Sequence, residues 1–339
     1  MNDYLFLLET LLLKIGSNPK KQYMLFNEQI EFDAHTNILP FILDKNKTVV
    51  KELLWTLTGS SDASELNKED IHHWDKVMVN LEDVLAFAKE HNLSDDDTEV
   101  LKGAIGSIGP MYGSMWRNLF INKDNSITFS QLASDKQKQV KELNDTLGKA
   151  TTGDDSAIND ITNQLFGNCV DQMQSLIYNI KNRVDTNYVV SSYVVDNLPI
   201  LSKSPQHNVL IGRCGAEPNV ILQEYFISEG TINGVRKLSL ILTISNLNML
   251  NDYMYITNFY YLLLKMVAQC ACLIPDKLII SIRKLYFNID DRNLLTALLM
   301  ISKDLVKDGT LPATKMLINP YKNDLFDFEL NDFVTSISD

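Results

Sequence analysis

The chain has 339 residues, of which 45% are hydrophobic and 22% charged, and its formal net charge at pH 7 is -12. These proportions are typical of a globular protein with a sizeable core and exclude a chain that is disordered over most of its length. The negative charge repels phosphate backbones, and no stripe of Lys and Arg with interleaved aromatics offsets it. We therefore expect no direct nucleic-acid partner.

The chain contains four cysteines, Cys169, Cys214, Cys270 and Cys272. They do not make a disulfide framework for a chain of this length, and they suit a reducing compartment. With five histidines and no CxxC pair, the sequence predicts no metal site. The N-terminal stretch lacks the basic region and cleavage site of a signal peptide, so we expect a cytoplasmic protein. The chain as a whole is rich in Asn, Asp and Lys, a composition that would suit a protein encoded by a bacteriophage or a virus. The expected compartment is then the host cytoplasm.

Hydrophobic periodicity predicts the elements of the first half of the chain. A helix is expected over residues 1–16, a strand over 22–32, and helices over 48–57 and 83–90. Residues 122–160 are polar and are predicted to form an insertion on a globular body.

The second half of the chain is richer in β-branched and apolar runs. A helix is predicted over 170–180, strands over 188–195, 220–227, 237–244 and 277–287, and an extended loop over 198–215. The apolar helix at 255–272 contains Asn258, Lys265 and Gln269, which favours a buried helix over a membrane span. Strands mixed with long helices predict an α/β or α+β fold.

Two motifs carry a family resemblance. Residues 51–75, KELLWTLTGSSDASELNKEDIHHWD, resemble a stretch of the thymidylate synthases, and residues 109–117, GPMYGSMWR, resemble that family's GPxYGxxWR motif. Residues 324–333 are similar to the family's terminal segment, so the resemblance covers most of the chain. It implies a single thymidylate synthase-like domain over 1–339, with a mixed sheet covered by long helices, and a symmetric homodimer.

The resemblance places the family's nucleophile at a residue without a thiol. The synthases and the related pyrimidine nucleotide hydroxymethylases add a cysteine thiolate to the pyrimidine ring. In these families the cysteine stands five residues before a Gln, and that Gln matches Gln223. That count puts Pro218 at the cysteine and Asn219 at the following histidine. Cys214 lies four residues earlier and is the alternative nucleophile, with Arg213 as its local cation. It can equally be read as a buried small residue.

Other positions of the family's pocket have also changed. The phosphate-binding arginines fall at Ser245, Thr186 and Asn187, and the N-terminal arginine loop is replaced by a segment with Lys20 and Lys21. The uracil-reading Asn falls at Ile256, the folate-contacting Asp at Asn248, and the sugar-contacting His at Lys284. The resemblance thus implies loss of the dianion site and of the base reader.

Seven positions of the family's pocket are retained: Glu52, Trp74, Asp75, Tyr112, Trp116, Gln223 and Tyr286. Glu52 matches the family's general acid/base and could relay a proton, or it could be a helix carboxylate held by hydrogen bonds. The aromatic positions are read as core and pocket walls rather than ligand platforms.

Three hypotheses remain open from the sequence. The first is a non-catalytic homologue, a degenerate member that acts as a structural or protein-interaction module, with no cofactor and with an unidentified protein partner. The second is an active methyl- or hydroxymethyltransferase that uses Cys214, Glu52 and methylenetetrahydrofolate. The third is a regulator that binds a nucleotide or another metabolite. A new partner could dock on the insertion at 122–160 or on the loop at 198–215.

Overall fold

The computed structural model describes residues 2–13, 22–41, 46–120, 169–184, 188–229, 236–288, 293–294, 296–300 and 313–338. Their contacts gather into two units, which we describe separately. The first comprises Met1–Leu54, Leu176–Ser191 and Asn219–Asp339, and the second comprises Trp55–Ser175 and Ser192–Pro218. The single domain over 1–339 stays a prediction, and the predicted insertion at 122–160 lies outside the described residues.

The first unit is built on a mixed sheet, which confirms the predicted α/β class. Its strands are β1 (Gln22–Asp33), β4 (Tyr188–Ser191), β5 (Val220–Glu229), β6 (Arg236–Ile244), β7 (Leu247–Asn248) and β8 (Ile274–Asn288). The order is β1-β8-β6-β5-β4, and β7 pairs with β8 off this path. β8 runs parallel to β6 and β7, whereas the β1–β8, β4–β5 and β5–β6 pairs are antiparallel.

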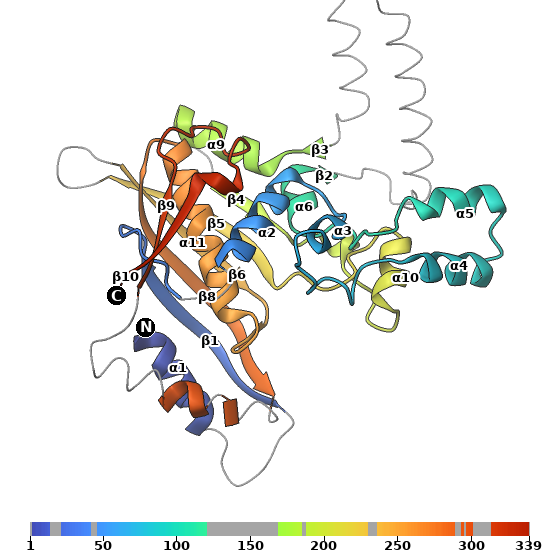
Figure 1. Ribbon diagram of the computed structural model, residues 1–339, viewed down its shortest axis with the longest axis horizontal. Helices are drawn as coiled ribbons and strands as arrows, with labels where there is room; N and C mark the ends of the chain where they lie inside the picture. Colours follow the sequence, from blue (N-terminus) through green and yellow to red (C-terminus); the bar gives the residue numbers. More distant parts are fainter. Residues whose placement is uncertain are drawn as a thin grey trace, which may run out of the picture. The chain divides into compact units, whose positions relative to one another are not determined.

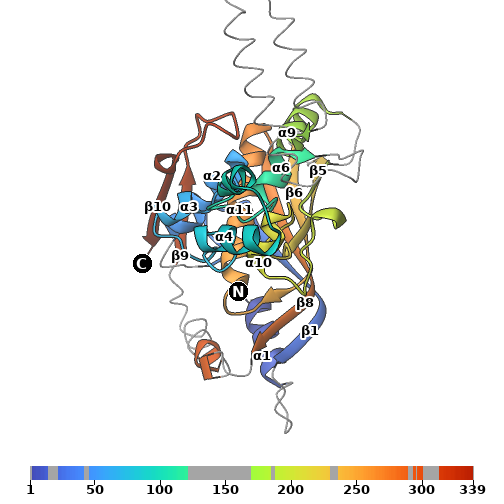
Figure 2. The same cartoon turned by 90° about the vertical axis from the view of Figure 1, so that its right-hand side faces the viewer.

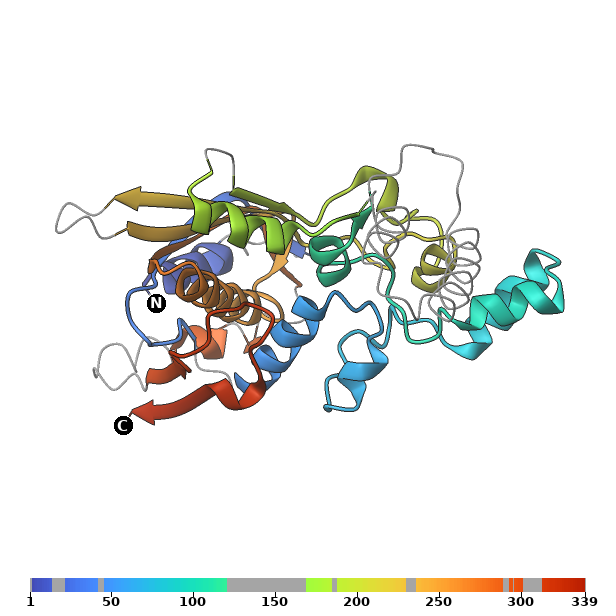
Figure 3. The same cartoon turned by 90° about the horizontal axis from the view of Figure 1, so that it is seen from above.

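A long buried helix covers one face of this sheet. Along β6 the side chains alternate, and Leu238, Leu240 and Leu242 are buried while their neighbours are partly exposed. Helix α11 (Tyr253–Cys270) packs on the buried face and makes the crossover between the parallel strands β6 and β8. Figures 2 and 3 show α11 between the sheet and the hairpin of β9 (Ala313–Ile318) and β10 (Phe333–Ser338).

The predicted buried helix at 255–272 is therefore confirmed. The observed helix begins and ends two residues earlier than predicted. Its polar residues are used internally, because Gln269 Nε2 donates hydrogen bonds to the carbonyl oxygens of Asn319 and Lys322, at 2.8 and 2.7 Å. In the part of the chain that the structure describes, no helix has the length and apolar character needed to cross a membrane.

Short helices dominate the second unit. They are α3 (Ser64–Asn67), α4 (Leu81–Glu90), α5 (Asp95–Lys102), α6 (Gly113–Arg117) and α10 (Pro205–Leu210), with η1 (Val195–Asn197) and the strand pair β2 (Leu119–Phe120) and β3 (Cys169–Val170). Figure 1 shows α4 and α5 as a helical pair beside α10. The remaining elements are α1 (Asn2–Leu13), η3 (Leu330–Asp332), and the helices α2 (Asn46–Thr58) and α9 (Gln172–Asn182), each of which runs through a boundary between the units.

Two predictions about secondary structure need correction. The strand predicted over 188–195 ends at Ser191, and η1 begins four residues later. The loop predicted over 198–215 contains helix α10, whose N-cap Ser204 accepts a hydrogen bond from the backbone of His207 at 3.1 Å. Ser204 followed by Pro205 at the first helical position is a helix-start signal. The prediction of one long loop overlooked it.

Candidate functional site

Cys214, the alternative nucleophile, is buried in the second unit with 2% of its surface exposed. It packs in an apolar cluster with Trp55, Ile108 and Met111, and its Sγ donates to the carbonyl oxygen of Pro110 at 3.1 Å. Burial raises the pKa of the thiol to about 12, and the charge of Arg213 offsets this only in part. The Arg213 side chain itself donates to the carbonyl of Leu198 at 2.8 Å. The thiol is therefore protonated and enclosed, which is the opposite of an activated nucleophile.

The glycines of the GPMYGSMWR motif are explained by close backbone packing. A Cβ at Gly113 would lie 2.1 Å from the carbonyl oxygen of Thr56 on α2, and one at Gly109, where φ is +81°, would lie 2.2 Å from that of Arg213. Only glycine permits either approach without moving backbone. The two glycines thus hold the motif against α2 and against the segment that carries Cys214.

The aromatic and charged residues of the same motif are also tied into the second unit. Trp116 is fully buried, and its Nε1 donates to the Ser192 hydroxyl at 2.7 Å. Arg117 donates from Nε to the Asp171 carboxylate and from a terminal nitrogen to the Leu57 carbonyl, both at 2.6 Å. These contacts support the interpretation of the motif as packing.

The rings of Trp74 and Tyr112 are partly exposed, and each has an aromatic neighbour. Their centroids lie 6.1 Å apart, and Tyr112 makes an edge-on contact with Trp116 at 6.3 Å. Asp75 is exposed and lies 3.3 Å from Nδ1 of His72. Trp74, Tyr112 and the buried Trp116 thus form a row of neighbouring rings in the second unit.

Glu52 lies on α2 in the first unit and is 5% exposed. Its carboxylate accepts a hydrogen bond from the hydroxyl of Tyr255 on α11. Burial raises the pKa of Tyr255, and the nearby charge of Glu52 raises it further. Sequence reasoning missed Tyr255, because no local signal links residues that are far apart along the chain.

Gln223 lies on the buried face of β5 and is fully enclosed. Its Oε1 accepts a hydrogen bond from the Tyr225 hydroxyl at 2.9 Å. Its Nε2 has no hydrogen-bond partner among the described residues. A buried amide nitrogen without an acceptor costs about 1–3 kcal/mol, so an acceptor supplied by a water or a ligand atom would be stabilising here.

Pro218 and Asn219, which are predicted to stand at the family's Cys and His positions, directly precede β5. Pro218 is buried and has no thiol to offer. The carbonyl oxygen of Asn219 accepts hydrogen bonds from the backbone nitrogen of Ser245 at 2.8 Å and from its hydroxyl at 3.1 Å. Ser245, which is predicted to stand at one of the arginine positions, therefore joins two chain segments and presents no cation.

The segment from 248 to 252 closes on itself. The Asn248 side chain accepts hydrogen bonds from the backbone nitrogens of Leu250 and Asn251, at 2.9 and 3.1 Å. Asp252 accepts one from the backbone nitrogen of Asn248 at 3.3 Å. Asn248 is 4% exposed. The side chain of Asn248, which is predicted to stand at the family's folate-contacting position, thus stabilises this turn.

Two further positions predicted to be substituted, Ile256 and Lys284, lie on α11 and β8 of the first unit. Ile256 is a partly exposed residue of α11. Lys284 on β8 places its ammonium 5.0 Å from the ring centre of Tyr286, a retained residue. Partial burial raises the pKa of Tyr286, as does the charge of Asp252. Thr186, Asn187, Lys20 and Lys21 lie outside the described residues.

Comparisons with known proteins all find members of one family. The family model described as thymidylate synthase matches residues 14–337 of this chain. A thymidylate synthase of Rhodopseudomonas palustris is 33% identical over 105 residues, which is 27% of this chain and 34% of that protein. One from Cereibacter sphaeroides is 30% identical over 102 residues, with the same coverage.

A thymidylate synthase of varicella-zoster virus is 31% identical over 124 residues, which is 34% of this chain and 36% of the viral protein. The chain thus spans about a third of the length of the curated relatives it matches.

Proposed function

Because this chain belongs to the thymidylate synthase family, we propose that it is a non-catalytic member of that family that acts as a structural or protein-interaction module. The observation that carries the proposal is the state of Cys214, which is enclosed by apolar side chains and has a pKa raised to about 12. Pro218 at the family's nucleophile position and Ser245 at an arginine position add to it.

Release of tritium from 5-tritiated dUMP in the presence of methylenetetrahydrofolate tests this proposal. An active bacterial thymidylate synthase serves as the positive control. We expect release at the rate of the protein-free blank. The contrary result is tritium release above the blank with the wild type but not with a Cys214→Ala variant. That result would establish the alternative, an active transferase that uses Cys214 and Glu52.

A second candidate function, a regulator that binds a nucleotide or another metabolite, is favoured by one observation. Gln223 Nε2 is buried and has no hydrogen-bond partner in the part of the chain that is described. Thermal denaturation with a panel of pyrimidine nucleotides and folates tests it, because a ligand that binds the native state raises the melting temperature. A Gln223→Leu variant that loses a shift seen in the wild type would support this candidate, and no shift across the panel would remove it.

The homodimer that the resemblance implies is part of the proposal. On the face of the sheet away from α11, Ile241 of β6 pairs in register with Glu224 and Ile279. Ile241 and Ile279 are partly exposed, and Phe226 on the same sheet is 50% exposed. These apolar side chains stand among polar ones such as Glu224, and they are stabilised when an identical face covers them.

Light scattering during size-exclusion chromatography measures the association. We expect twice the chain mass of 38.5 kDa for the wild type and a monomer for Ile241→Glu. Val334→Glu is the matched control, because Val334 is already 58% exposed on the β9–β10 hairpin. A wild type that is monomeric at micromolar concentration contradicts the dimer.

The cytoplasmic location is a further part of the proposal. Cys214, Cys270 and Cys272 are free thiols in the structure, which suits a reducing compartment.

A further inference from the structure

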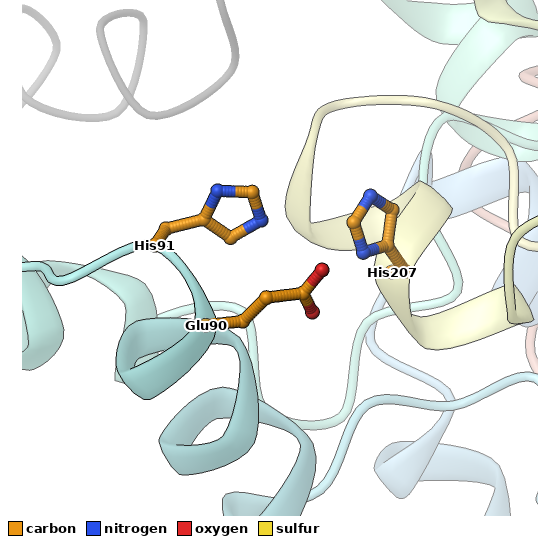
Figure 4. Close-up of side chains that lie close together, drawn as sticks. All are labelled: Glu90, His91 and His207. Carbon is orange, nitrogen blue, oxygen red and sulfur yellow. The ribbon is translucent and has the colours of Figure 1, made fainter.

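Three potential metal ligands meet in the second unit, at the end of α4 and the start of α10. Glu90 is the last residue of α4, and His91 is its C-cap. His207 lies in the first turn of α10. Figure 4 shows the carboxylate of Glu90 between the two imidazole rings. One ligand atom from each residue lies within 4.8 Å of the other two.

The backbone that carries these side chains is fixed by a packed core. Val84 of α4, Leu101 of α5, and Val209 and Leu210 of α10 belong to one buried cluster, against which Phe87 packs. The backbone nitrogens of His91 and His207 are bonded to the Phe87 carbonyl and the Ser204 hydroxyl, at 3.0 and 3.1 Å. Side-chain rotation alone can therefore adjust the ligand atoms, because both helices are held in place.

We propose that Glu90, His91 and His207 form a binding site for a divalent transition-metal ion, with zinc as the best match. Two imidazole nitrogens and one carboxylate oxygen are a ligand set that zinc accepts, with water at the fourth position. Bond lengths of about 2.0–2.2 Å place tetrahedral ligand atoms roughly 3.4 Å apart. The three side chains therefore have to close by little more than an ångström.

The exposure of the site leaves it open to solvent. Glu90 and His91 are exposed, so water can fill the remaining coordination position.

Aromatic packing alone is the competing explanation. The Phe87 ring lies 4.2 Å from that of His91 and 5.2 Å from that of His207, measured between centroids. Tilted ring contacts account for the two imidazoles near Phe87, but they do not involve the Glu90 carboxylate that lies between them. A metal ion uses all three groups and would join segments that are far apart along the chain.

Cobalt(II) and zinc(II) titrations of the full chain, purified without a histidine tag, test the proposal. We expect one zinc per chain by calorimetry, and visible cobalt absorption of the intensity typical of tetrahedral sites. His91→Gln and His207→Gln should each weaken binding by about tenfold or more, since each removes one of three protein ligands. Glu90→Gln should weaken it as well.

His72→Gln is the matched control. His72 is an exposed histidine of the same unit and lies near Asp70 and Asp75, so it reports generic surface binding. Melting curves in EDTA check that every variant folds like the wild type. The proposal is overturned if the wild type binds no zinc at micromolar concentration. It is equally overturned if His72→Gln weakens binding as much as His91→Gln and His207→Gln do.

Discussion

Residues 109–117 resemble a motif of the thymidylate synthase family, whereas residues 245–256 are predicted to have lost the pocket side chains of that family. In 109–117 the glycines, the Trp and the Arg each meet a packing demand, such as the approach of Gly113 to the Thr56 carbonyl. In 245–256 the substituted side chains bond within their own neighbourhood, as Asn248 does to the backbone of its own turn. Within these two segments, the residues that match the family pack against buried backbone, and the predicted substitutions make local hydrogen bonds.

A substitution in the retained segment should have the largest effect on stability. Gly113→Ala places a Cβ where the Thr56 backbone stands, so we expect it to lower the free energy of unfolding by about 3 kcal/mol or more. Urea denaturation measures the loss. Gly103→Ala is the control, because its Cβ would meet only the Val100 carbonyl at 3.2 Å and its φ of -62° is helical. Equal free energies of unfolding for the two variants would contradict the claim that Gly113 is required for packing against α2.

The accessibility of the thiols tests whether Cys214 belongs to packing or to chemistry. With a pKa of about 12, only about one Cys214 in ten thousand is a thiolate at pH 8, and the side chain is also buried. We expect iodoacetamide to alkylate it at least about a hundredfold more slowly than the exposed Cys272.

Peptide mass spectrometry after timed quenching distinguishes the two sites. Because the pKa lies far above neutrality, the rate at Cys214 should stay low from pH 7 to pH 9. Rapid labelling of Cys214 at pH 7 would mean that it is an activated thiol.

The smallest expected effect concerns the buried pair in the first unit. Tyr255→Phe removes the hydroxyl that donates to Glu52, and we expect a loss of about 1–3 kcal/mol of folding free energy. Tyr321→Phe should leave stability unchanged, because Tyr321 is 90% exposed. Thermal denaturation of both variants gives the comparison. If Tyr255→Phe changed turnover rather than stability, Glu52 would have a chemical role.

Much of the fold could be predicted because it depends on local patterns. The alternation of buried and partly exposed residues in β6 and the continuous apolar surface of α11 are visible in the sequence. Helix α10 was missed because its six residues are too few for a periodic signal. That omission also concealed the approach of His207 to His91, which depends on the packing of α10 against α4.

The chemistry of the candidate site could be predicted only in part. Matching residues to family motifs identified which positions had changed, such as Ser245 and Lys284. The motifs do not show what the new side chains do. The hydrogen bond from Ser245 to Asn219, for example, forms because the end of β6 lies beside the start of β5. The state of Cys214 likewise depends on neighbours from several segments of the chain.

The pairing of β1 with β8 has a consequence for biosynthesis. Gln22 of β1 lies opposite Asn288 of β8, so β1 cannot pair with this neighbour until the ribosome has synthesised β8, more than two hundred residues later. At a translation rate of about 5–20 residues per second, β1 waits on the order of tens of seconds with its backbone groups unpaired. During that interval the nascent chain is open to wrong strand partners, and a chaperone that shields residues 22–33 should raise the yield of native protein.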